Sequence, residues 1–153
     1  MHELYDLLHI LGVVLFFGGM IVSLKWLFLV EMRKRAGALQ IAVQWTYRLT
    51  MFVTAPGIAL IIVSGILQMS RTGGLFSQSW LVVGLMLFAL SVLAWLIFFV
   101  PCHSKLLRIS AHSGDQLPPD FFTLLHRLYF FGAIIIIFPL GTMLFSILKP
   151  SLW

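Results

Sequence analysis

The sequence predicts an all-α integral membrane protein, folded as a four-helix transmembrane bundle. Of its 153 residues, 61% are hydrophobic and only 10% are charged, and the mean hydropathy is +1.05. Soluble domains are far less apolar. Crossing a bilayer takes about 20 apolar residues, because a helix rises roughly 1.5 Å per residue. Four stretches are long enough, and the expected helices cover about residues 7–30, 45–69, 80–102 and 121–148 of a single domain over residues 1–153.

The first expected helix is the one that carries ionisable side chains inside its apolar stretch, His9 and Lys25. It is too long for the core of a secretory signal, and its N-terminal flank has no Lys or Arg, so we expect it to be retained. Lys25 is expected to extend toward the headgroups at the inner end. The apolar stretches of the other three helices, residues 49–69, 80–102 and 128–148, contain no Asp, Glu, Lys or Arg.

The connections between the helices are short, which makes neighbouring helices antiparallel and predicts an up-down-up-down order. "EMRKRAGALQ" is basic and is expected to lie at anionic headgroups, while "SRTGGLFSQS" is typical of a tight turn. In the second inner loop, "KLLRIS" is expected to extend as a surface helix, and Asp120 is expected to cap the fourth helix.

The basic residues divide between the two sides of the expected membrane, which predicts the orientation of the chain. Eight of the ten flank the loops after the first and third helices. By the positive-inside rule these loops are cytoplasmic and both termini are periplasmic, in the inner (cell) membrane of a bacterium. Because the basic residues form no patch with interleaved aromatics, we expect no nucleic-acid partner. The single cysteine, Cys102, excludes an internal disulfide.

Small and polar residues recur at helical spacing and predict the inward faces, because lipid solvates large apolar side chains as well as a neighbouring helix does. The four stripes are His9, Gly12, Phe16, Gly19 and Ser23; Thr50, Thr54, Gly57, Ile61, Ser64 and Gln68; Gly84, Phe88, Ser91, Trp95 and Cys102; and Tyr129, Gly132, Ile136, Pro139, Met143 and Ser146. The small residues of these stripes either allow close helix packing or, beside the aromatic residues, leave a slot for a flat, apolar cofactor.

His9 is the leading candidate site residue, because an ionisable group inside a membrane is costly and usually functional. A neutral imidazole at this depth could ligate haem iron or a copper ion, relay protons, or hydrogen-bond to a Thr, a Ser or Gln68. For haem, Met143 is the best-placed second axial ligand and Met86 is an alternative at similar depth. A weak copper contact could also involve His2.

A second cluster lies at the inner ends of the third and fourth helices. Cys102, His103 and His126 are expected at similar depth there. His103 and His126 could ligate a haem or another metal, or could be interfacial histidines without a role. No catalytic triad, carboxylate pair or phosphate loop is present, so any catalysis would depend on a cofactor.

Several motifs resemble a known family. "LHILGVVLFFGGM", "APGIALIIVSGIL", "SWLVVGLMLFALSVLAW" and the closing "FPLGTMLFSILKP" are together similar to the small four-helix membrane proteins called domain of unknown function 2269. That family is similar in pattern to HemJ-type protoporphyrinogen oxidases and to the CopD membrane domain. The HemJ-type pattern is matched by His9, Gly19, Lys25, Lys149 and Pro150, with lysine at position 25 where arginine is usual.

The resemblance implies a haem b cofactor and tetrapyrrole redox chemistry. We therefore expect a haem b bound within the bundle, held by His9, and a role in electron transfer or the haem pathway, with a membrane redox partner or a larger complex. Whether the chain is itself an enzyme stays open. The alternatives are a non-catalytic accessory or scaffolding subunit, in which His9 only packs, and copper handling at the outer face. Homo-oligomerisation is compatible with all three.

Overall fold

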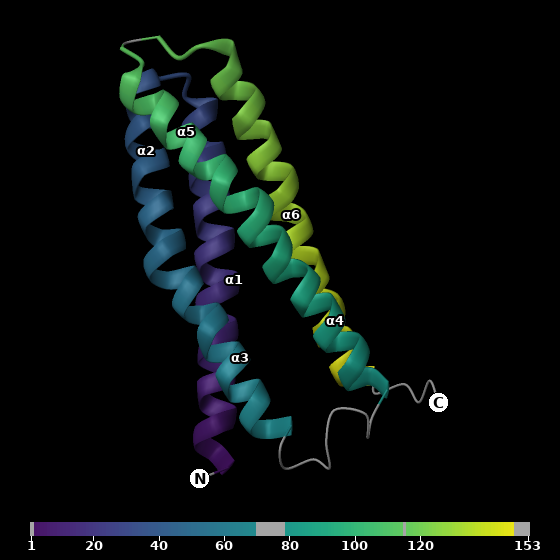
Figure 1. Cartoon of the computed structure of the whole chain (residues 1–153). Helices are drawn as coiled ribbons and strands as arrows, with labels where there is room; N and C mark the ends of the chain where they lie inside the picture. Colours follow the sequence, from purple (N-terminus) through teal and green to yellow (C-terminus); the bar gives the residue numbers. More distant parts are fainter. Residues whose placement is uncertain (1, 70–78, 115, 149–153) are drawn as a thin grey trace.

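The computed structural model describes residues 2–69, 79–114 and 116–148, all of which belong to helices or their connections. The first and last helices are α1 (His2–Met32) and α6 (Pro119–Leu148). Between them run α2 (Ala36–Leu49), η1 (Thr50–Thr54) and α3 (Ala55–Met69), followed by α4 (Ser79–Ala94), η3 (Trp95–Phe99) and α5 (Val100–His112). The described helices form four rods of alternating direction, as predicted (Figure 1).

The second and third rods are longer than their apolar stretches, because amphipathic segments continue the helix at the end where α1 meets α2. The second rod runs unbroken through α2, η1 and α3, and the third through α4, η3 and α5. The segment "KLLRIS" therefore continues the third rod and does not form a separate surface helix. Thr46 and Leu106, which lie in these extensions, are buried against neighbouring rods, which gives the extensions a packing face.

Each of these two rods contains one π-helical turn just before a proline. Thr50–Thr54 precedes Pro56 by two residues, and Trp95–Phe99 precedes Pro101 by two residues. Proline has no backbone N–H and its ring clashes with the carbonyl four residues earlier, so a wider turn is a way to keep the helix continuous. The disturbance that Pro56 imposes on the second rod therefore takes the form of a π turn.

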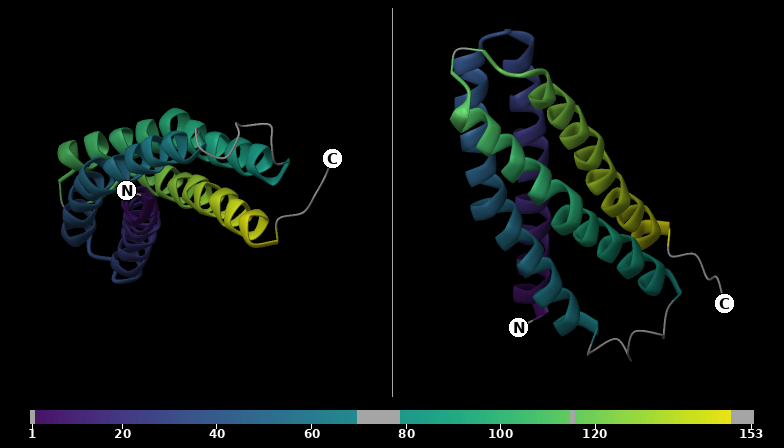
Figure 2. Two further views of the ribbon diagram at one scale, coloured as in Figure 1. Left: turned by 90° about the horizontal axis from the view of Figure 1, so that it is seen from below. Right: turned by 45° about the horizontal axis from the view of Figure 1, so that its top comes forward.

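The rods pack as two pairs. α1 packs mainly on α3, and α4 packs mainly on α6. The pairs meet at the end where α2 and α5 lie, and they diverge toward the end where α1 begins and α6 ends (Figures 1 and 2). Phe16 and Phe88, whose ring centroids are 6.4 Å apart, connect α1 and α4 midway along the rods.

The predicted inward stripes are confirmed for most of their members. Gly12, Phe16, Gly19 and Ser23 on α1 are buried, and so are Thr50, Thr54, Gly57, Ile61 and Ser64 on the second rod. Met143 is an exception, since its side chain is 44% exposed. Thr142 faces α4 instead, and its hydroxyl donates to the Gly84 carbonyl over 3.1 Å. The side chain of Ser146 lies outside the described residues.

All four rods are long and apolar enough to cross a bilayer, and their spans are Glu3–Met32, Ala36–Gln68, Ser79–His112 and Pro119–Leu144. Large apolar side chains such as Phe52 and Ile137 point outward, at 77% and 61% exposure. In water such a surface would be strongly unfavourable, whereas lipid solvates it.

Candidate functional site

The first part of the candidate site is a polar contact between α1 and α3. His9 Nδ1 lies 3.0 Å from the Ser64 hydroxyl oxygen. That hydroxyl donates its own proton to the Leu60 carbonyl, one turn earlier on α3. The Ser64 oxygen can therefore only accept from the imidazole, which places the His9 proton on Nδ1 and leaves the lone pair on Nε2. This is the tautomer of a histidine that ligates through Nε2.

Close packing of α1 on α3 fixes the position of this imidazole. A Cβ added to Gly12, one turn from His9, would lie 2.9 Å from the Gly57 carbonyl oxygen. The helices can approach this closely only because both positions are glycine. His9 itself is half-buried and lies about two turns beyond Phe16, where the two helix pairs have begun to diverge (Figure 1).

A second polar contact joins the same two helices nearer their ends. The Gln68 side-chain amide donates to the Asp6 carboxylate over 2.9 Å. Gln68, which was one expected partner of His9, is therefore bonded to Asp6, and Ser64 takes the contact with the histidine.

The two methionines proposed as second axial ligands belong to the other helix pair. Met86 on α4 and Met143 on α6 are 63% and 44% exposed. The structure therefore does not bring either sulfur into a packed contact around His9. The hydrogen bond from Nδ1 to Ser64 leaves Nε2 as the His9 nitrogen that could serve as a ligand.

His103 lies at the other end of the bundle and is completely buried. Its Nε2 is 3.3 Å from both the Val43 carbonyl and the Thr46 hydroxyl. A carbonyl can only accept, so Nε2 carries the proton and Nδ1 carries the lone pair. Nδ1 has no hydrogen-bond partner within the described part of the chain. The rings of Tyr47 and Phe99 pack edge-on against the imidazole.

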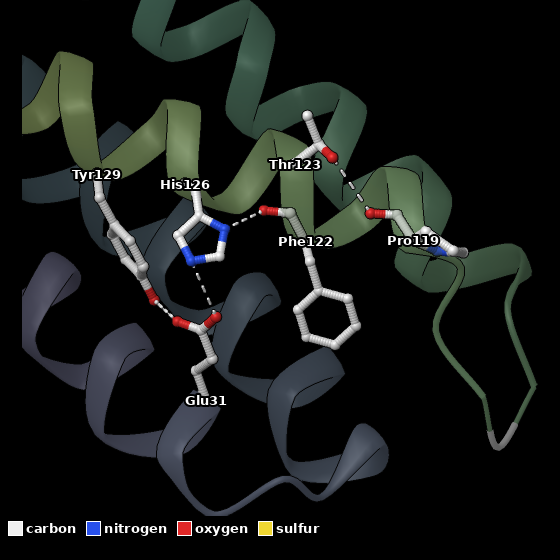
Figure 3. Close-up of polar contacts among 6 residues, drawn as sticks. All are labelled: Glu31, Pro119, Phe122, Thr123, His126 and Tyr129. Carbon is white, nitrogen blue, oxygen red and sulfur yellow. Dashed lines mark hydrogen bonds and ion pairs between the residues drawn. The ribbon is translucent and has the colours of Figure 1, made fainter.

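His126 is turned toward a different helix from His103. Its Nδ1 donates to the Phe122 carbonyl over 2.8 Å, and its Nε2 is 3.6 Å from a Glu31 carboxylate oxygen (Figure 3). Both ring nitrogens therefore have protein neighbours. The structure places His103 against α2 and His126 facing α1, so it does not assemble the expected bis-histidine pair. Cys102 donates its thiol proton to the Leu124 carbonyl over 3.4 Å.

The sequence alone did not reveal the contact between α1 and α6 that holds this end together. The Tyr129 hydroxyl donates to Glu31 Oε2 over 3.0 Å, and His126 approaches the other oxygen (Figure 3). Two signals in the sequence could have suggested the pair of Glu31 and Tyr129: both lie at the same end of their expected helices relative to the membrane, and Tyr129 is on a predicted inward stripe. Helical spacing does not show, however, that the Glu31 side chain extends far enough to contact α6.

Removing the tyrosine hydroxyl is expected to weaken this contact more than removing the histidine. Tyr129→Phe leaves the mostly buried Glu31 carboxylate without its hydroxyl donor, and hydrogen bonds to charged groups contribute about 1.5–3 kcal/mol. His126→Gln removes a partner that is 68% exposed, so the expected loss is below about 1 kcal/mol. Unfolding titrations in detergent micelles measure both values, and equal losses would contradict this ranking.

The copper expectation rests partly on His2, whose side chain lies outside the described residues. Among the described side chains, no group of three or more His, Cys, Asp or Glu residues could hold a metal ion. Lys149 and Pro150, which carry the end of the HemJ-type pattern, also lie outside the described residues.

Fold and site together define a polytopic α-helical membrane protein with buried polar contacts between its helices. The family described as "Predicted integral membrane protein (DUF2269)" matches residues 3–150, nearly the whole chain, and the protein belongs to this family. The expected family is therefore confirmed. No curated protein and no solved structure matches the chain.

Proposed function

We propose that this protein binds haem b through His9 and acts in electron transfer or tetrapyrrole redox chemistry in the bacterial inner membrane. The observation that supports the proposal is the hydrogen bond from His9 Nδ1 to Ser64. Metal-ligating histidines almost always donate their second ring N–H to a fixed acceptor, which sets the ring orientation and the tautomer. Ser64 has this role here, on a helix that glycine contacts hold against α1.

The chain's own residues hold and orient the imidazole, and the redox chemistry belongs to the cofactor. Haem b supplies one-electron transfer when bound. The Ser64 hydroxyl donates its proton to the Leu60 carbonyl, so it does not donate to a ring nitrogen of His9. His9 lies in the half of the bundle that the positive-inside rule assigns to the periplasm.

An absorption spectrum of protein purified from haem-replete cells tests the proposal. The wild type is expected to show a Soret band, and His9→Ala is expected to lose it. His112→Ala is the matched control, because His112 is exposed near the end of α5 and its ring bonds to the Arg108 carbonyl one turn earlier. A wild-type spectrum without a Soret band, or a band that survives in His9→Ala, would overturn the proposal.

Ser64 is a positioning residue in this scheme, and its substitution has a separate expected result. Ser64→Ala removes the acceptor at Nδ1, and loss of such an outer partner typically weakens metal affinity by about 10–100-fold. Haem titration of the apoprotein measures this value. Retention of wild-type haem affinity together with an unchanged spectrum in Ser64→Ala would show that the hydrogen bond only packs the two helices.

An accessory or scaffolding subunit is the second candidate, and one observation favours it. The outer portions of α4 and α6 present large apolar side chains, including Met86 and Leu144 at 63% and 58% exposure, where the helix pairs diverge. Transmembrane helices of a larger complex could cover this surface. A stoichiometric membrane partner in mild-detergent extracts, without a Soret band, supports this function. Stoichiometric copper that is lost on substitution of His2 and His9 supports copper handling instead.

A further inference from the structure

A groove between the third rod and α6 combines basic and aromatic side chains in a defined order. It has a volume of about 810 Å³ and lies near the end of the bundle that carries most of the basic residues. Eleven residues line it, among them Phe98, Lys105, His126, Arg127, Phe130 and Phe131. None of these residues is Asp or Glu.

The polar end of the groove carries two permanent positive charges. Lys105 on α5 and Arg127 on α6 line it from opposite sides, and both are exposed. His126 lies beside Arg127, and the carboxylate that His126 faces, Glu31, is bonded to Tyr129 and does not line the groove. The cations therefore have no acidic neighbour among the lining residues, and the site favours an anion.

The other end of the groove is apolar. Phe98 and Phe131 stack with ring centroids 4.9 Å apart and planes only 8° from parallel, which makes a flat wall between the two helices. Ile97 and Phe130 beside it are 58% and 62% exposed. The two neutral polar side chains of the lining already have hydrogen-bond acceptors, since Cys102 donates to the Leu124 carbonyl and Thr123 to the Pro119 carbonyl.

The two ends are separated along the membrane normal in the order of a phospholipid. Lys105 lies eight residues from Ile97, about 12 Å along the helix, and Arg127 lies four residues from Phe131 on the antiparallel α6. On both helices the basic residue is nearer the end of the bundle, because Lys105 lies closer than Phe98 to the end of α5 at His112, and Arg127 lies closer than Phe131 to the start of α6 at Pro119. An anionic headgroup can therefore reach the cations while its acyl chains follow the aromatic wall.

We propose that this groove binds one anionic phospholipid of the surrounding leaflet, with the phosphate between Lys105 and Arg127. Charge complementarity selects this occupant, because a zwitterionic lipid would bring its own cation to a site that already has two. The groove opens to the bilayer in which the chain resides, so the ligand needs no other entry path. This inference is independent of whether the protein binds haem.

Native mass spectrometry of the purified protein, titrated with phosphatidylglycerol or phosphatidylcholine of the same acyl chains, tests the site. The wild type is expected to bind one phosphatidylglycerol in preference to phosphatidylcholine. Lys105→Gln with Arg127→Gln is expected to weaken phosphatidylglycerol binding roughly 30-fold, since each basic residue near anionic lipid contributes about a factor of five.

The matched control is Arg48→Gln with Arg108→Gln, which changes the net charge equally. Both arginines are exposed at the same end of the bundle, and neither lines the groove. This variant is expected to bind phosphatidylglycerol like the wild type. Circular dichroism and gel filtration confirm that both double variants fold.

Three results would overturn the proposal. One is equal affinity of the wild type for the two lipids, and another is an equal loss in the control variant, which would indicate general surface charge. The third is full competition by soluble glycerol 3-phosphate, which would show that the apolar wall plays no part in binding.

Discussion

Replacing Gly57 by leucine is expected to prevent stable packing of α1 on α3 and to leave little folded protein after mild-detergent extraction. A Cβ at this position would lie 2.8 Å from the Phe16 backbone nitrogen and 3.0 Å from the Gly12 carbonyl oxygen. These neighbours are backbone atoms of α1, which cannot move aside as a flexible side chain can. The whole helix would have to move away, and the contact between His9 and Ser64 would be lost with it.

The alanine variant gives a graded form of the same experiment. Gly57→Ala adds one methyl group to a filled interface, and overpacking of this kind costs about 1–3 kcal/mol. The reference positions are Gly65 on the same helix and Gly18 on α1, where an added Cβ meets no other described residue within 4 Å. Gly65→Ala and Gly65→Leu are therefore expected to fold normally, with a gain of up to about 1 kcal/mol from helix propensity.

Gel filtration and unfolding titrations in micelles measure these differences. A Gly57→Leu protein as monodisperse and stable as Gly65→Leu would show that α1 and α3 are not in close contact. Loss of folded protein in both leucine variants would instead point to a general effect of side-chain bulk on this helix.

The sequence was sufficient to predict the membrane class, the four rods and their alternating direction, because length and hydropathy decide these features in lipid. The inward stripes also followed from composition, and buried positions such as Gly12, Ser64 and Ser91 confirm the rule that small and polar residues face helices. The π turns did not follow. A proline predicts a disturbed turn, but helical periodicity does not distinguish a kink from a widened turn.

The candidate site was only partly predictable, because helical periodicity gives the face of a residue but not its partner. His9 could be predicted as a site residue because burying an ionisable group in lipid costs free energy. Its partner Ser64 could not be predicted, because it is one of several hydroxyl residues on the facing stripe. Met143 shows the limit of helical periodicity as a guide: it was expected to face inward, but its neighbour Thr142 contacts α4 and the Met143 side chain is exposed. The hydrogen bond between Tyr129 and Glu31 depends on how α1 and α6 are placed relative to each other, and the spacing of residues along one helix does not give that placement.

His103 provides the second large expected effect, and here volume and polarity act in opposite directions. The side chain is completely buried between Tyr47 and Phe99. His103→Ala would leave a cavity between these rings, and large-to-small substitutions in packed interiors typically cost about 2–5 kcal/mol. A strong decrease in the denaturant midpoint is expected.

His103→Leu is expected to remain within about 1 kcal/mol of the wild type. Leucine restores most of the volume and removes the buried Nδ1 lone pair, which has no partner among the described residues and is costly to bury. Thr46 loses little, because its hydroxyl already donates to the Ala42 carbonyl over 2.8 Å. The weak contacts of Nε2, both 3.3 Å long, are the remaining loss. If His103→Leu proves as unstable as His103→Ala, these hydrogen bonds outweigh packing at this end of the bundle. If it is as stable as the wild type, packing volume outweighs these hydrogen bonds, and the imidazole contributes its shape more than its polarity to this end of the bundle.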